Sequence, residues 1–189
     1  MSVFWKSSRM SARLTKALPC SDSRRDVKWL VLHFIKFQMN LTQLHRIRQT
    51  AIDKNWKGME QFFNSSIQLR HSGIRVDLTD INKPLVIIDP IEEYHKGGIG
   101  TEAVNGAVIA MLADLAIGLL GLTHYEEGMT GTSQLSINYV KPLLAKKIIV
   151  HAEQTQVINK RIFGIVRVMN EKEEVCAYAT GALAKGILI

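Results

Sequence analysis

The chain has 189 residues, enough for one domain of ordinary size with a sizeable apolar core. It is 47% hydrophobic and 22% charged, which is the composition of a globular protein. Its net charge is +7, but +6 of that lies in residues 1–40, where eight Lys and Arg residues outnumber two Asp. Because the rest of the chain is almost neutral, the charge argues against a nucleic-acid-binding protein.

The cysteines and histidines give no sign of a metal site. Cys20 and Cys176 are far apart, no C-x-x-C or H-E-x-x-H pattern occurs, and the six His are scattered. We therefore predict no metal and no other cofactor. Two distant cysteines fit a reducing compartment, and we expect a cytoplasmic protein.

Residues 1–40 are predicted to be a basic N-terminal extension. Residues 1–26 are rich in Ser and Arg, a composition that fits a transit peptide, a disordered arm or an upstream extension of the gene model. Regular patterning begins just after Met39, which favours the gene-model extension. The apolar run at 27–37 contains Lys and His and is too short to span a bilayer, so we expect an amphipathic helix there. Residues 41–189 then form a single domain.

The first part of this domain is predicted to be helical. Apolar residues recur at helical spacing over 41–69, and Gly58 is expected to break the helical stretch. Phe62 and Phe63 follow that break as a short apolar patch. We interpret these aromatic residues as core residues rather than ligand contacts.

Strands are predicted on both sides of one long apolar helix. Alternation of apolar and polar residues predicts a hairpin of strands at 74–79 and 85–88, followed by a polar, glycine-rich loop at 92–100. Val104–Leu122 is the longest apolar run in the chain and is predicted to be a helix. After a loop at 123–131, four more strands are predicted, at 132–140, 148–158, 161–169 and 174–188.

This order of elements predicts an α+β fold. Strands joined by short turns form an antiparallel sheet, and a helix this apolar must be wrapped by it. That layout is the hotdog fold, here with an N-terminal helical segment. The apolar run could instead span a membrane, but 19 residues is a marginal length and no Lys or Arg cluster flanks it. Asp114 near its midpoint would also be costly in lipid, so no membrane span is predicted.

Three residues of this helix, Asn105, Gly106 and Asp114, are candidates for an active site. Asn105 is a good N-cap, because its side chain can accept a hydrogen bond from the N–H of Ala107 or Val108. With Gly106 next to it, the open N–H groups of the first turn could stabilise a developing oxyanion. Asp114 lies eight residues further on, roughly 12 Å along the axis. The two could share a site only in a homodimer with antiparallel helices. Two structural alternatives stay open: an ordinary helix start at Asn105-Gly106, and an Asp114 carboxylate bonded to Ser or Thr of a neighbouring strand.

The same segment carries a family resemblance. The ten residues from Asn105 to Asp114 resemble the H-G-G-x-x-A-x-L-x-D motif of hotdog-fold acyl-CoA thioesterases of the phenylacetyl-CoA thioesterase (PaaI-like) type. The segment TSQLSINYVKP at 132–142 resembles that family's strand ending in aromatic-x-basic-Pro. Ala179-Thr180-Gly181 is similar to its A-T-G ending, so the resemblance covers about residues 60–188.

The resemblance implies hydrolysis of acyl-CoA thioesters by a homodimer or a dimer of dimers. It implies that the Gly106 N–H polarises the thioester carbonyl and that Asp114 from the partner chain acts as nucleophile or general base. Thr132 would orient the attacking water. Asn105 stands where the family usually has His, and Ala107, beside the substrate, stands where it has a second Gly. An Asn can donate to a carbonyl but cannot exchange protons.

Substrate contacts also follow from the resemblance. Family members bind CoA near the surface with basic side chains, which implies that role for Lys141, Lys160 and Arg161. The acyl pocket would be lined by the central helix and the strand of Tyr139. Three other functions stay open: a hotdog dehydratase, a non-catalytic acyl-CoA-binding or sensing protein, and a structural partner that only dimerises. A dehydratase would need a His where Asn105 stands, so the binding protein is the main alternative.

Overall fold

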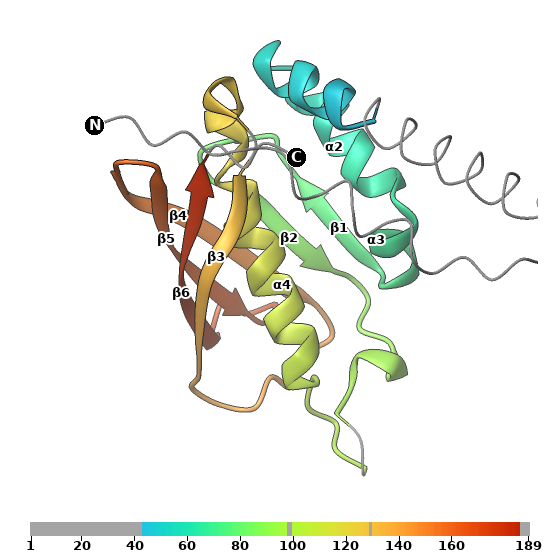
Figure 1. The fold of residues 1–189 in the computed structure, drawn as a ribbon. Coiled ribbons are helices and arrows are strands. Elements are labelled where there is room, and N and C mark those ends of the chain that lie inside the picture. Colours follow the sequence, from blue (N-terminus) through green and yellow to red (C-terminus); the bar gives the residue numbers. More distant parts are fainter. Residues whose placement is uncertain (1–42, 98–99, 129, 186–189) are drawn as a thin grey trace, which may run out of the picture. The chain divides into compact units, whose positions relative to one another are not determined.

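The computed structural model of this chain describes residues 43–97, 100–128 and 130–185 (Figure 1). The predicted extension at 1–40 and the helix expected within it lie outside these residues. A compact unit begins at Leu44. Within the described ranges, no helix is long and apolar enough to cross a membrane.

Three short helices come first: residues 43–52, α2 (Trp56–Ser65) and α3 (Ile67–His71). The predicted break at Gly58 is wrong, because Gly58 lies inside α2. The chain turns earlier, at Lys54, which has a positive φ of 53°. Asn55 sets the start of α2, since its side chain accepts a hydrogen bond from the Gly58 N–H at 2.9 Å.

Within the described residues, six strands form one antiparallel sheet, with the order β1-β2-β4-β5-β6-β3. The strands are β1 (Ile74–Asp77), β2 (Leu85–Ile88), β3 (Thr130–Tyr139), β4 (Ile148–Ile158), β5 (Arg161–Met169) and β6 (Val175–Lys185). Short 3-10 helices η1 (Glu93–His95) and η2 (Leu122–Glu127) lie in the segments predicted as loops. The predicted succession of strands and helix is therefore confirmed, and β1 and β3 are the two edges of the sheet.

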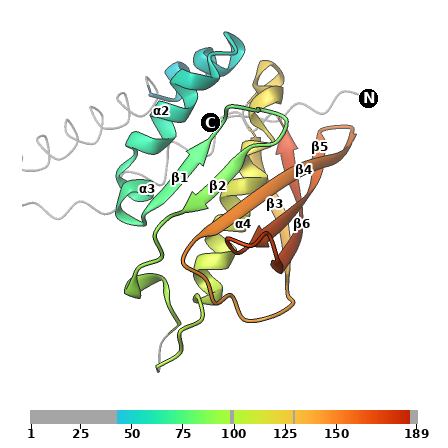
Figure 2. The same ribbon diagram turned by 180° about the vertical axis from the view of Figure 1, so that it is seen from behind.

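The sheet curves around one side of α4 (Gly106–Leu119), as Figures 1 and 2 show. This inner side of α4 packs against β3, β4, β5 and β6. Glycines in the sheet let the helix approach: a Cβ at Gly181 would lie 3.1 Å from the Ile117 side chain. The α+β hotdog prediction is confirmed. The buried residues of this inner side are Ile109, Leu112, Ala113, Ala116, Ile117 and Leu119.

The opposite side of α4 is open in the single chain. Ala107 and Asp114 are exposed, and Met111 and Leu115 are only partly buried. A Cβ added at Gly118 would meet no described atom within 4 Å. The sheet therefore wraps the inner side of α4 only. The sheet leaves an apolar face of α4 uncovered, with one carboxylate in it.

Candidate functional site

The start of α4 offers an open hydrogen-bond donor. Asn105 is the N-cap, as expected, and its side-chain oxygen accepts from the Ala107 N–H at 2.8 Å. The Asn105 N–H donates to the carbonyl oxygen of His95 at 2.9 Å. The Gly106 N–H has no hydrogen bond to any residue in the described ranges. This donor lies at the positive end of the helix and is available to a carbonyl or anionic oxygen.

Tyr139 supports this helix start from the end of β3. Its hydroxyl donates to the Gly106 carbonyl oxygen at 3.0 Å, and 57% of the residue is exposed. A Cβ at Gly106 would lie 3.3 Å from the same hydroxyl oxygen, so any larger residue would crowd the phenol. Tyr139 was expected in a strand lining the acyl pocket. The structure places its hydroxyl beside Gly106 at the start of α4.

His95 joins three segments near the same point and was not singled out from the sequence. It is 2% exposed, and its Nδ1 accepts from the Glu92 N–H at 2.9 Å. Nε2 therefore carries the hydrogen and donates to the Ser72 carbonyl oxygen at 2.9 Å. With its own carbonyl holding Asn105, His95 connects the end of α3 to the start of α4. The contact with Glu92 is local, but those with Ser72 and Asn105 join distant backbone segments, so spacing gave no signal for this role.

Asp114 is exposed near the middle of α4 and forms no hydrogen bond or ion pair with a described residue. The alternative of a carboxylate bonded to a neighbouring Ser or Thr therefore finds no support within one chain. Thr132 is exposed on β3, and no hydrogen bond joins it to Asp114. Because α4 is continuous, Gly106 and Asp114 remain roughly 12 Å apart along the axis.

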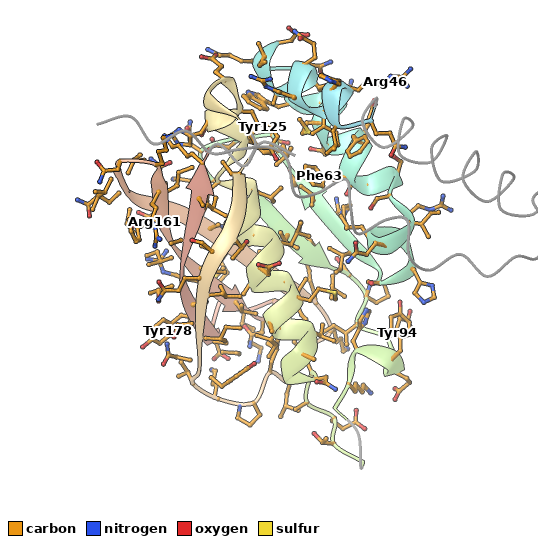
Figure 3. All side chains as sticks on the ribbon, in the orientation of Figure 1. Arg46, Phe63, Tyr94, Tyr125, Arg161 and Tyr178 are labelled. Carbon is orange, nitrogen blue, oxygen red and sulfur yellow. The ribbon has the colours of Figure 1, made fainter. Side chains whose placement is uncertain are left out.

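Asp114 lines a pocket of about 360 Å³ between α4 and the helices α2 and α3. A second pocket of about 420 Å³ continues along the same side of α4, and Met111 lines both. Figure 3 shows Phe63 and Tyr94 on this side of α4, with Arg161 and Tyr178 on the other side. The first pocket is lined by Phe62, Phe63, Ser66, Gln68, Leu69, Ile74, Met111, Asp114 and Leu115. The second is lined by His71, Ser72, Tyr94, His95, Val108 and Met111.

Phe62 and Phe63 thus line a pocket, although the sequence suggested core residues. Their rings meet edge to face, with centroids 6.2 Å apart. Phe62 is 38% exposed, and Phe63 packs against the core with part of its surface free. A pair of adjacent aromatic residues on an amphipathic helix was the available signal, but the sequence did not show that α4 would face it.

Lys141 lies just beyond β3, at the same end of the sheet as Tyr139. Its Nζ is 3.0 Å from the Glu174 carboxylate. This hydrogen bond, followed by that from Asn170, holds the pKa of Glu174 below its ordinary value. Lys141 therefore presents a cation close to the start of α4 that already has an acidic partner.

Lys160 and Arg161 lie at the turn between β4 and β5 and are exposed. Arg161 pairs with Ala184 near the end of β6, whereas Tyr139 pairs with Ala177 near its start. The two groups of basic residues are therefore at opposite ends of the sheet. Within one chain Lys141 therefore lies apart from Lys160 and Arg161. In the described part of the chain, no group of three or more His, Cys, Asp or Glu could hold a metal ion.

Known proteins share this fold. Residues 102–177, which include α4, match the family model of the thioesterase superfamily. A protein from Shewanella oneidensis related to that superfamily has a TM-score of 0.62 and 19% identity, covering 71% of this chain and 97% of its own. The PaaI protein from the phenylacetic acid degradation operon of Escherichia coli has a TM-score of 0.60 and 15% identity. The match covers 71% of this chain and 94% of the PaaI chain. This chain has the hotdog fold of the PaaI-like thioesterases.

A thioesterase from Haemophilus influenzae shows the same likeness, with a TM-score of 0.60 and 17% identity over 68% of this chain and 88% of its own. No curated protein sequence matches the chain. The resemblance to hotdog-fold thioesterases of the PaaI-like type is confirmed. The segment that matches the family model contains both Gly106 and Asp114.

Proposed function

We propose that this protein hydrolyses acyl-CoA thioesters to a free acid and CoA. The match to the thioesterase superfamily supports thioester hydrolysis as the general activity. One observation carries the proposal: neither the Gly106 N–H nor the Asp114 carboxylate of α4 has a partner among the described residues, and Asp114 lines a largely apolar pocket. Hydrolysis of a thioester needs a donor for the carbonyl oxygen and a base for water, and these are the two groups.

The two groups combine only if two chains associate. The Val140 N–H donates to the Cys176 carbonyl oxygen at 2.9 Å, in register with the pair Tyr139–Ala177. In an antiparallel ladder this leaves the N–H and C=O groups of Ile137 and Tyr139 pointing away from β6. An open edge of this length is a template for a second strand. A homodimer, or a dimer of dimers, would also cover the open face of α4.

In the dimer, the thioester carbonyl accepts a hydrogen bond from the Gly106 N–H of one chain. Because the Asn105 side-chain oxygen is bound to Ala107, its amide NH₂ can be a second donor. Asp114 of the other chain takes a proton from water as the water oxygen bonds to the carbonyl carbon. The C–S bond then breaks, the carbonyl re-forms, and the proton passes from Asp114 to the departing CoA sulfur. Thr132 orients the water.

In this proposal, basic residues at the two ends of the sheet bind the CoA phosphates. Lys141 lies at the same end as Gly106 and serves the site of its own α4 start. Lys160 and Arg161, at the far end, serve a site formed with the second chain. Ala107 lies beside the bound carbonyl, where its backbone N–H holds the Asn105 cap.

Substitution of Asp114 tests the activity directly. Wild type is incubated with acetyl-, octanoyl-, phenylacetyl-, succinyl- and hexadecanoyl-CoA, and the released thiol is followed with a thiol reagent. We expect Asp114→Asn to lower kcat by about 10²–10⁴. Asp53→Asn, at an exposed turn position just after the helix at 43–52, is the control and should leave kcat unchanged. Equal turnover by wild type and Asp114→Asn would contradict the proposal.

Mixing two inactive variants tests whether the site is shared. Gly106→Val crowds the Tyr139 hydroxyl and covers the donor, so it should be inactive alone, like Asp114→Asn. After co-expression, half of a random population is heterodimer with one intact site, so activity should recover to about one quarter of wild type. No recovery, with both variants folded and dimeric, would contradict a shared site.

A non-catalytic acyl-CoA-binding protein is the second candidate, favoured by Asn105. An amide can cap the helix and hold a carbonyl, but it cannot carry a proton to or from the reacting atoms. Saturable binding of acyl-CoA by wild type and by Asp114→Asn, with no thiol released by either, would support this alternative.

A further inference from the structure

We propose that His95 is a positioning residue for the proposed reaction: its imidazole, in the neutral form, holds the backbone that places the Gly106 N–H. This inference rests on the proposed thioesterase activity. His95 acts from outside the reacting atoms, because it is 2% exposed and both ring nitrogens bind backbone groups. It acts through Asn105, whose N–H donates to the His95 carbonyl oxygen at 2.9 Å.

The surroundings of His95 hold its ring in one orientation. The Tyr94 ring packs on it, with the ring centroids 4.2 Å apart. A Cβ at Gly73 would lie 3.4 Å from His95 Cε1, and Gly73 has a positive φ of 61°, which glycine adopts without strain. The hydrogen bonds to the Glu92 N–H and the Ser72 carbonyl oxygen then fix the rotation of the ring. Any movement of the imidazole must therefore move the backbone around it.

A short antiparallel pairing carries the position of His95 to the start of α4. The Asn105 N–H donates to the His95 carbonyl oxygen. Two residues further along, the Gly97 N–H donates to the Ala103 carbonyl oxygen at 2.7 Å, and one antiparallel bridge lies between these two hydrogen bonds. The pairing ends at Asn105, directly before Gly106. A shift of the His95 carbonyl therefore shifts the N-cap and the open N–H that follows it.

Protonation of His95 would break this anchor. A neutral imidazole has one donor and one acceptor nitrogen, whereas an imidazolium has two donors. The protonated ring could still donate to the Ser72 carbonyl oxygen, but it could not accept from the Glu92 N–H. Since the ring has one orientation in which it fits, protonation should displace η1 and, with it, the start of α4. The donor is therefore held where the ring is neutral and is released as the pH falls.

The groups around the ring determine which control is needed. From α4, the residues that line the pocket beside His95 are apolar. The titratable or charged groups of the described residues on η1, on the segment after it and at the end of α3 are Glu92, Glu93, Tyr94, Lys96, Glu102 and His71. His71 is the other imidazole in this set, and it is exposed. His71→Gln is therefore the matched control.

The amide resonance of Gly106 reports the coupling without any substrate. In wild type, its ¹⁵N and ¹H shifts should follow the titration of the His95 ring between about pH 8 and about pH 5. In His95→Gln, whose side chain can accept from the Glu92 N–H and donate to the Ser72 carbonyl, this titration should disappear. It should persist in His71→Gln. A Gly106 resonance that ignores the titration of His95 in wild type would overturn the positioning role.

Kinetics test the consequence for the reaction. His95→Leu leaves both backbone groups without partners and should lower kcat about 10–100-fold with KM within about twofold, because it is the carbonyl donor that is displaced. His95→Gln should keep kcat within about fivefold of wild type at about pH 8. From about pH 8 to about pH 5, wild type should lose about tenfold more kcat than His95→Gln, in which protonation of Asp114 alone remains.

Each outcome decides one of the two proposals. Equal pH profiles of kcat for wild type and His95→Gln would overturn the positioning role while leaving the thioesterase intact. No hydrolysis by wild type would contradict the thioesterase, and the Gly106 resonance would still decide whether His95 positions the donor. If His95→Leu does not fold, the profile of His95→Gln against those of wild type and His71→Gln decides.

Discussion

The two edge strands, β1 and β3, differ in whether described side chains bind their outward backbone N–H and C=O groups. On β1, the Asn64 side chain of α2 accepts from the Val76 N–H and donates to the Val76 carbonyl, both at 2.8 Å. The Glu60 carboxylate accepts from the Leu78 N–H just beyond the strand, at 2.9 Å. Along β3, no described side chain binds the outward groups of Ile137 in this way. Side chains of α2 therefore occupy the outward backbone groups of β1, whereas those of Ile137 on β3 have no partner among the described residues.

The open edge lies beside the open face of α4, and this placement connects assembly with activity. The carboxylate of Asp114 and the apolar side chains around it are on the helix face that the sheet does not cover. The inner face of the same helix is the core of the fold. Stability therefore resides mainly in the closed side of the molecule, and the proposed chemistry in the side that a second chain would complete.

Blocking strand pairing at the open β3 edge should have the largest effect on activity. Ile137→Pro removes an N–H that points away from β6, so the inner ladder keeps its hydrogen bonds while the outer one cannot form. We expect a monomer by sedimentation and a loss of hydrolysis on the order of 100-fold, because the two halves of the site separate. Ile137→Val, which keeps the N–H, should remain dimeric and active. A fully active monomer would contradict the shared site.

Removing the Asn64 side chain that covers the β1 edge should instead lower the free energy of unfolding. Asn64→Leu leaves the Val76 N–H and C=O without partners, so unfolding in urea should require about 2 kcal/mol less free energy. Asn64→Asp keeps the acceptor but loses the donor and should lie between wild type and Asn64→Leu. Dimerisation should be unchanged in both variants. A dimer weakened by Asn64→Leu, with unchanged stability, would mean that β1 and not β3 is the assembly edge.

Local chemistry explains which parts of the fold the sequence predicted. The hairpin of β4 and β5 was predicted with its observed bounds, because alternation and the turn at Asn159-Lys160 are encoded within a few residues. The helix start at Asn105 is likewise a local cap. The position of the break before α2 was missed because Gly58 is only a weak helix breaker, whereas the Asn55 cap is a specific hydrogen bond.

The rest depended on contacts between distant residues. Val104–Leu122 is apolar all round, so its pattern could not show which side the sheet would cover or that Asp114 would be exposed. The pocket joins Phe63 to Asp114 across about 50 residues of sequence, and only the packing of α2 near α4 brings them together. Strand register, which separates Lys141 from Lys160, also arises only from pairing.

Removing the contact between β3 and the helix start should have a smaller effect. Tyr139→Phe loses the hydrogen bond to the Gly106 carbonyl, which contributes about 1 kcal/mol and so about a fivefold change in kcat/KM if it positions the donor. Because the ring remains, dimerisation and overall stability should change little. Tyr178→Phe, another exposed tyrosine on the sheet, is the control. Equal kcat/KM for Tyr139→Phe and wild type would show that the contact does not position Gly106.

The smallest expected effect concerns acid stability at the end of the open edge. Lys141 is the largest cause that holds the pKa of Glu174 below its ordinary 4.5. A carboxyl group with a lowered folded pKa stabilises the folded state above its unfolded pKa, and that stability is lost as the pH falls through the folded pKa. Below about pH 4.5 wild type should therefore lose slightly more Tm than Lys141→Met, and the two should converge in high salt because the pair is exposed. Parallel Tm curves at low salt would show that the ion pair adds nothing to stability.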